Sequence, residues 1–223
     1  MHRVKLALKL DCATRSMDDL FLKSGFPRLY EHVLRLPVIR SIRRQEQRTL
    51  HRTFAENLDG GEILEVGAGT GFYTFDIACR VQSVTALERS PGMTRILRLR
   101  ILSAGARNIT VVESDFFSYA PERRFDAVIA IGVLDCVNDA RAFLVRCISL
   151  ATSCVIVTIP RSSFWASIHS FFGGMMGMRV SVYRPEEVAR YLHGYRYALT
   201  ETGLRTSLTH GLTLVAVIKT SRE

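Results

Sequence analysis

The chain has 223 residues, 48% of them hydrophobic, and carries a formal net charge of +9. This length and apolar content suit one domain with a sizeable core. No apolar run approaches the roughly 20 residues that span a bilayer, and no signal-peptide core stands near the N-terminus. The five cysteines form no C-x-x-C pair and lie mostly in apolar stretches, so buried free thiols and a reducing, cytoplasmic location are expected.

Residues 1–58 are the basic part of the chain, with 12 Lys or Arg against 6 Asp or Glu. A break at Gly25-Phe26-Pro27 precedes one predicted helix, and a longer amphipathic helix is predicted over 38–58. We expect a helical cap or lid here, followed by a second unit at 59–223. This positive charge would attract RNA or an anionic membrane surface. Attraction to the membrane would imply a peripheral position at its surface. The plainer alternative is a solvated helix face.

A strand, a glycine turn and a helix follow one another at residues 62–81. Residues 62–66 have the apolar content of a short buried strand, and residues 72–81 have helix-like apolar spacing. Between them, every second position is a glycine, at Gly67, Gly69 and Gly71. Glycine allows a positive φ and lets a ligand approach bare backbone, while a helix start presents unpaired N–H groups. The order predicts a nucleotide-type site.

Alternating strands and helices occupy the rest of the chain and predict a largely parallel sheet. A helix is predicted over 91–104, with Ser90 as its cap and Met93, Ile96, Leu97, Ile101 and Leu102 as its buried side. The last two strands lack a helix-length connection, so we expect them to be antiparallel. The remaining expected elements are strands at 84–87, 109–112, 125–131, 154–159, 195–201 and 212–220, and helices at 140–150 and 185–192.

The run Leu64-Glu65-Val66-Gly67-Ala68-Gly69-Thr70-Gly71 resembles motif I of the class I S-adenosylmethionine-dependent methyltransferases. The resemblance covers roughly residues 60–220. It implies an α/β fold with a Rossmann-like, seven-stranded, mostly parallel sheet, helices on both faces and an antiparallel last strand, here with the N-terminal helical cap. It also implies S-adenosylmethionine as the cofactor, S-adenosylhomocysteine as the product and no metal. A dehydrogenase-type nucleotide fold is the alternative that the glycines alone leave open.

Further residues match the family's cofactor site one by one. Glu88 ends the second strand, where an acid can accept hydrogen bonds from both ribose hydroxyls. The resemblance implies that Asp115 takes the adenine amino group, unless it only caps the next turn, and that Phe116 offers its backbone N–H to the ring. Glu65 is expected to help hold the ammonium group. The whole expected cofactor set is Glu65, Gly67, Ala68, Gly69, Gly71, Glu88, Arg89, Met93, Asp115, Phe116, Ile131 and Tyr30.

The acceptor side is predicted to follow the fourth and fifth strands. Methyl transfer from a sulfonium is an in-line displacement, so donor and acceptor must be close, aligned and dry. A hydroxyl acceptor would benefit from a positioned base. The candidate catalytic residues are Asp135, which the resemblance places near the methyl donor, and His169, which lies in an aromatic and Met-rich insertion at 161–183. The plainer interpretation is a structural histidine in a cover for the sheet edge.

A second, shorter resemblance concerns the acceptor. The run Gly25-Phe26-Pro27-Arg28-Leu29-Tyr30 and the insertion after the fifth strand are similar to the magnesium-protoporphyrin O-methyltransferase family. In that family an N-terminal Tyr covers the cofactor, a place that Tyr30 would take. The resemblance implies a large apolar acceptor bearing a carboxylate, for which Arg161 and Arg179 would be partners.

The predicted function is therefore methyl transfer to a small apolar or aromatic metabolite, at an oxygen, nitrogen or carbon atom. Gly132-Val133-Leu134-Asp135 stands where amino-group methyltransferases of adenine or glutamine carry [DN]-P-P-[YF], and the Pro-Cys pair of cytosine C5 enzymes is missing. DNA is thus not an expected partner. The alternatives are an RNA methyltransferase and a non-catalytic regulatory module that binds the cofactor. The oligomeric state stays open.

Overall fold

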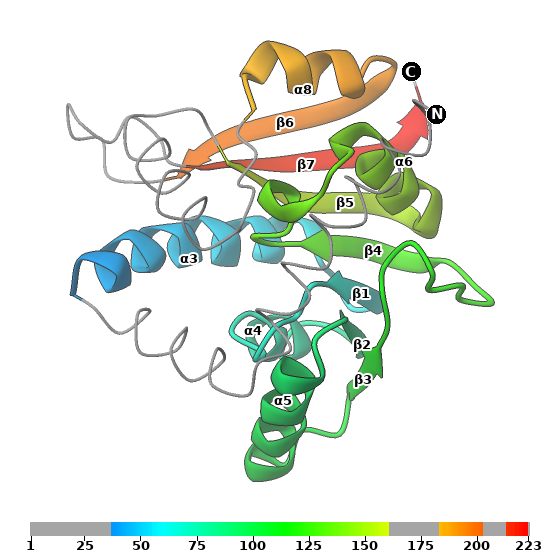
Figure 1. Cartoon of the computed structure of the whole chain (residues 1–223). Coiled ribbons are helices and arrows are strands. Elements are labelled where there is room, and N and C mark those ends of the chain that lie inside the picture. The colour runs from blue at the N-terminus through cyan, green and yellow to red at the C-terminus, as the bar shows by residue number, and fades with distance from the viewer. Residues whose placement is uncertain (1–36, 161–182, 203–212, 223) are drawn as a thin grey trace, which may run out of the picture.

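The computed structural model describes residues 37–160, 183–202 and 213–222. Its centre is a seven-stranded sheet in the order β3-β2-β1-β4-β5-β7-β6, which Figure 1 shows from β3 at the bottom to β6 at the top. The strands are β1 (Glu62–Val66), β2 (Ser83–Glu88), β3 (Ile109–Glu113), β4 (Phe125–Ala130), β5 (Ala151–Pro160), β6 (Tyr195–Thr202) and β7 (Thr213–Arg222). The predicted α/β class and strand number are confirmed.

The pairing directions follow from the connections. β1 pairs in parallel with β2 and β4. Helices α4, α5 and α6 form the crossovers from β1 to β2, from β2 to β3 and from β4 to β5, whereas residues 114–124 connect β3 to β4 without a helix. β7 is antiparallel to both β5 and β6, as predicted for the last strand. The chain leaves β1 toward β2 on one side and returns to β4 on the other. In parallel sheets the crevice at such a switch point, outside the carboxyl ends of the strands, is where ligands bind.

Helices cover both faces of the sheet. They are α3 (Pro37–Asn57), α4 (Thr74–Ala78), α5 (Pro91–Ala104), the 3-10 turn η1 (Leu134–Cys136), α6 (Ala140–Leu150) and α8 (Pro185–Tyr191). On one face, Leu50 and Phe54 of α3 pack with Ile77 of α4 and with strand residues such as Ile63. On the other, Phe143 of α6 shares a core with α8 and the opposite side of the same strands.

The C-terminal half of α3 is part of the core. Leu50 and Phe54 have no exposed surface. Two polar contacts also join α3 to the helix behind the glycine turn: His51 Nε2 lies 2.8 Å from Asp76 Oδ2, and Tyr73 Oη donates to Glu46 Oε2 at 3.1 Å. This part of α3 therefore packs as a layer of the fold. The cap or lid is expected over residues 1–58, of which residues 1–36 lie outside the described part of the chain, so this role stays a prediction.

Three details differ from the sequence-based expectations. Leu102 of α5 was expected to be buried but is 78% exposed, because it points away from the side on which Leu97 contacts the sheet. The helix after the glycines covers only Thr74–Ala78, since the residues just after Gly71 form turns. Cys79 is exposed, whereas Cys147 and Cys154 are buried free thiols as predicted.

None of the helices in residues 37–160, 183–202 and 213–222 is long and apolar enough to cross a membrane. Nor do three His, Cys, Asp or Glu side chains of those residues gather in a way that could hold a metal ion.

Candidate cofactor and active site

The turn after β1 is held by backbone hydrogen bonds to β2. The amides of Gly67 and Ala68 both donate to the carbonyl oxygen of Leu87, at 2.8 and 3.1 Å, and Gly71 N donates to Ala68 O at 2.9 Å. The turn therefore sits beside the end of β2, at the carboxyl edge of the parallel strands. This is the position that the glycine spacing predicted.

The three glycines of this turn have different surroundings. All have positive φ values, of +71° at Gly67, +56° at Gly69 and +87° at Gly71. A Cβ on Gly67 would lie 2.5 Å from Val133 Cγ2, and one on Gly71 would overlap the buried Leu97 side chain. A Cβ on Gly69 would meet no atom within 4 Å. Two glycines thus permit close packing within the fold, while Gly69 alone faces open space.

Glu88 ties the turn to the end of β2. Its Oε2 accepts from Gly69 N at 2.9 Å and its Oε1 accepts from Ser90 N at 2.8 Å. Burial raises the pKa of this carboxyl, and the backbone donors of Ser90, Gly69 and Arg89 partly oppose that change. A carboxylate offers about four acceptor positions, so these donors do not use all of them. Glu88 can therefore position the turn and still accept hydrogen bonds from a ligand's hydroxyls.

Glu65 is a buried carboxyl with an unpaired oxygen. The residue is only 4% exposed, and its Oε2 has no hydrogen-bond partner among the described residues. Desolvation raises the pKa of Glu65 to about 8, and the charge of Glu88 adds to the effect. The nearby Thr74 hydroxyl lowers the pKa of Glu65, but it makes no hydrogen bond of ordinary geometry with any described residue and is itself buried. Two unsatisfied buried polar atoms beside one turn mark a place where a polar group is missing.

The residues after β3 form a compact loop. Asp115 Oδ1 accepts from Phe117 N at 2.8 Å and from Ser118 N at 3.3 Å, so the carboxylate does cap the next turn. The Phe116 ring is buried against Phe143, with a centroid separation of 4.9 Å. Asp115 remains exposed, so the capping contacts leave room for a further bond.

Arg146 of α6 holds this loop in place through two hydrogen bonds. Its Nε donates to the carbonyl oxygen of Phe116 at 3.0 Å and its second guanidinium nitrogen donates to Tyr119 O at 2.5 Å. Its Cζ also lies 5.3 Å from the centre of the Phe116 ring. One planar cation thus holds two carbonyls and an aromatic face.

The exit of β4 is held by two side chains from later in the chain. Gly132 N donates to the Thr158 hydroxyl at 2.7 Å, and the Tyr183 hydroxyl donates to Leu134 O at 3.2 Å. Thr158 and Tyr183 are both buried. Asp135 belongs to η1, directly after this anchored stretch. Its backbone is therefore at the same edge as the glycine turn.

The structure brings most of the predicted site residues to this edge. Ala68 and Met93 are buried, Ile131 is half-buried at the end of β4 and Arg89 is exposed beside Glu88. Gathered from four strand ends are Glu65, Gly67, Ala68, Gly69, Gly71, Glu88, Arg89, Met93, Asp115, Phe116, Ile131 and Asp135. Tyr30 and His169 lie outside the described residues, so their roles stay predictions.

Several supporting residues were missed by the sequence reasoning. Thr158 could have been found, because it is the one polar residue in the otherwise apolar run 154–159. Arg146 and Tyr183 have no such signal, because their partners are backbone carbonyls at positions 116, 119 and 134.

Known proteins share parts of this arrangement. Residues 63–152 match the family described as methyltransferase domain. Ubiquinone biosynthesis O-methyltransferase from Rhodopseudomonas palustris is 29% identical over 163 residues, which are 65% of this chain and 61% of that protein. Demethylmenaquinone methyltransferase from Tropheryma whipplei is 35% identical over 85 residues, or 38% of this chain and 35% of that protein. For the first curated relatives the match spans only 26–35% of their own length.

A solved structure resembles nearly the whole chain. The magnesium protoporphyrin IX methyltransferase from Synechocystis, crystallised with bound SAH, has a TM-score of 0.76 and 20% sequence identity. The superposition covers 94% of this chain and 100% of that one. At this identity the likeness establishes the fold, and it extends beyond the stretch that the sequence relatives share.

Proposed function

We propose that this chain, whose residues 63–152 match the methyltransferase-domain family, is a class I S-adenosylmethionine-dependent methyltransferase that transfers a methyl group from S-adenosylmethionine to a small apolar or aromatic acceptor. The observation that carries this proposal is the unpaired, buried carboxyl of Glu65 beside a glycine turn that Glu88 holds. An amino-acid ammonium and a pair of ribose hydroxyls are the complementary groups.

The residues present fit this cofactor. The open space next to Gly69 admits a ligand against bare backbone. Glu65 would supply an acceptor for the ammonium group, and Glu88 would accept the ribose hydroxyls with its remaining lone pairs. Asp115 and the amide of Phe116 would bind adenine, with Met93 against one face of the ring. When bound, the cofactor supplies an electrophilic methyl group on a sulfonium.

The chain's own contribution to the reaction is placement. Thr158 and Tyr183 hold the exit of β4, and thereby the backbone of η1, at a constant position beside the cofactor site. A rigid exit of this kind favours the in-line arrangement that displacement requires. Asp135, and His169 from the insertion, are our candidates for accepting a proton from a hydroxyl acceptor. A carboxylate acceptor would need neither.

The acceptor class is inferred from the relatives. Those described above are named for demethylmenaquinone, ubiquinone biosynthesis and magnesium protoporphyrin IX. We extend to this chain the common feature of these names, an apolar small molecule that contains a ring. Residues 1–36 and the insertion at 161–183 are the parts that we expect to form its binding site.

The deciding experiment separates binding from transfer. Calorimetry with S-adenosylhomocysteine first tests the cofactor site. The protein is then incubated with S-adenosyl-L-[methyl-³H]methionine and cell extract, and the label is measured in organic-soluble, RNA and protein fractions. We expect label in the organic-soluble fraction, reduced with Glu88→Ala, whose lost ribose bonds weaken cofactor binding by about 2 kcal/mol. Label in RNA instead, or binding without any transfer, would select one of the two alternatives.

A further inference from the structure

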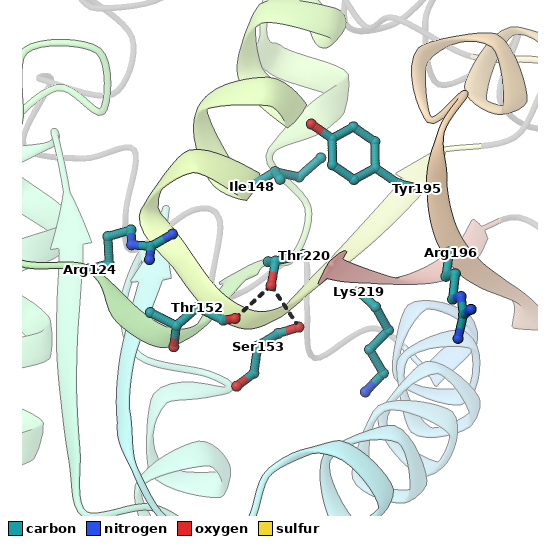
Figure 2. Close-up of a pocket in the computed structure, with 8 residues that line it drawn as sticks. All are labelled: Arg124, Ile148, Thr152, Ser153, Tyr195, Arg196, Lys219 and Thr220. Atoms are coloured by element: carbon teal, nitrogen blue, oxygen red, sulfur yellow. Dashed lines mark hydrogen bonds between the residues drawn. The ribbon is translucent and has the colours of Figure 1, made fainter. Parts of the chain in front are cut away.

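A hollow lies at the end of the parallel strands opposite the glycine turn. It has a volume of about 610 Å³ and is lined by Arg124, Ile148, Thr152, Ser153, Tyr195, Arg196, Lys219 and Thr220. Figure 2 shows Ile148 and Tyr195 on one side, with the Lys219 and Arg196 side chains extending on the other. These residues flank the amino ends of β4, β5 and β6 and the carboxyl end of β7. The glycine turn is at the other end of the same parallel strands, about 20 Å away for a six-residue strand.

Two register irregularities meet at this hollow. Between β4 and β5 the pairing jumps from Phe125–Ala151 to Ala127–Cys154, so Thr152 and Ser153 stand opposite one residue. Between β6 and β7 it jumps from Tyr195–Arg222 to Tyr197–Ile218. Bulges of this kind turn side chains away from the regular alternation and are frequent next to binding sites. Residues from both bulges line the hollow.

Local contacts hold this edge in shape. The Thr220 hydroxyl contacts the carbonyl oxygens of Thr152 and Ser153, at 2.6 and 3.2 Å, across the irregular stretch. Lys219 Nζ donates to Asn57 Oδ1 at 3.1 Å, which directs its ammonium group along the end of α3. These contacts fix Thr220 against β5 and Lys219 against the end of α3.

The charge of the lining is of one sign. Three of the eight lining residues are cationic, three are serine or threonine, and none is acidic. The carboxylate of Asp126 lies beside the lining: its Oδ2 accepts from Glu62 N at 2.7 Å, and its Oδ1 lies 3.5 Å from the hydroxyl of Thr152. Glu62 pairs with Arg123, the neighbour of Arg124, at 2.8 Å. The lining itself is therefore basic, with one carboxylate at its border.

We propose that this hollow binds a small polyphosphate, such as the phosphate chain of a nucleotide, at a site separate from the cofactor site. Three cations spread along the rim suit a ligand with several negative groups in a row, because each group can meet a different cation. The Ser153 hydroxyl adds a hydrogen-bond donor for a phosphate oxygen, whereas the hydroxyls of Thr152 and Thr220 already donate to backbone carbonyls. The volume falls within the range of small-ligand pockets.

The test uses tripolyphosphate, which contains no adenosine and so cannot occupy a nucleoside site. Its affinity for the full chain is measured by calorimetry at low salt, with S-adenosylhomocysteine saturating. Arg124→Gln and Lys219→Gln are each expected to weaken it about tenfold. Arg95→Gln is the matched control, because it removes the same charge from an exposed position on α5, on a distant part of the sheet. It should change the affinity less than twofold.

Two further ligands define what is recognised. Inorganic phosphate should bind more weakly than tripolyphosphate, since it spans fewer cations. Cytidine triphosphate should bind at least as well as tripolyphosphate, and a gain would add a base contact with the Tyr195 ring. Failure of tripolyphosphate to bind at millimolar concentration overturns the proposal. An equal loss in Arg95→Gln also overturns it, because that result would reflect net charge alone.

Discussion

The unpaired carboxyl of Glu65 predicts that cofactor binding releases a proton. With a pKa of about 8, Glu65 is mostly neutral in the ligand-free protein at pH 7, holding about 0.9 proton by the titration equation. A ligand ammonium placed beside it favours the ionised form and lowers the pKa toward its ordinary value. Binding at pH 7 should therefore expel close to one proton from this site.

The assay is calorimetry of S-adenosylhomocysteine binding in two buffers that differ in ionisation enthalpy. The slope of the observed enthalpy against the buffer enthalpy counts the protons exchanged. Glu65→Gln is the matched control, because it keeps the shape and cannot titrate. We expect wild type to release about 0.9 proton more than this variant at pH 7. Equal slopes for the two proteins would refute the assignment of Glu65 to the ammonium group.

The same carboxyl makes the stability of the ligand-free protein depend on pH. The folded pKa is raised from 4.5 to about 8, so the folded state binds more protons than the unfolded state between these values. The contribution of Glu65 to stability is then complete below pH 4.5 and is lost as the pH rises through 8. From pH 6 to pH 9 the free energy of unfolding should fall by about 3 kcal/mol. Urea unfolding should show no such fall from this site in Glu65→Gln.

Four other substitutions test separate parts of the site. Gly69→Ala should cost about 1–2 kcal/mol of stability because of its positive φ, and it should abolish S-adenosylhomocysteine binding. Gly71→Ala should lower the melting temperature further, because its Cβ overlaps a core side chain. Equal falls in melting temperature for the two variants would contradict the different surroundings of these glycines. Arg146→Lys should weaken cofactor binding measured by calorimetry, with loss of about 2 kcal/mol from the carbonyl contacts, and unchanged affinity would remove its positioning role. Thr158→Val leaves Gly132 N–H unpaired at similar volume, so denaturant unfolding should show a loss of about 1–3 kcal/mol.

Local patterns were enough to predict the order of the elements and which strand ends lie together. Parallel strands end at one edge, so Gly67, Glu88 and Asp115 had to lie near one another once their strands were recognised. The cap of α5 was also predictable, because Ser90 accepts from Met93 N as its residue type indicates. Each of these inferences depends on a few neighbouring residues.

The remaining features depend on contacts between distant segments. The separate roles of Gly69 and Gly71 follow from whether another side chain happens to approach, which spacing alone does not encode. The exposure of Leu102 depends on how α5 is rotated over the sheet, and the five-residue spacing from Leu97 turns it away. The basic hollow arises from two bulges, and register irregularities have no signal in hydrophobic periodicity.

The bond from the Tyr183 hydroxyl to Leu134 O has a consequence for how such a chain can diversify. The described fold stops at Pro160 and resumes at Tyr183, and both points are fastened to the central strands, by pairing with Thr213 and by this hydroxyl. Because the entropic cost of joining two fixed points changes slowly with the number of residues between them, the sequence between these anchors can change in length with little effect on the stability of the sheet. Under the function proposed above, new acceptor preferences can then evolve between Pro160 and Tyr183 while the cofactor-binding residues stay the same.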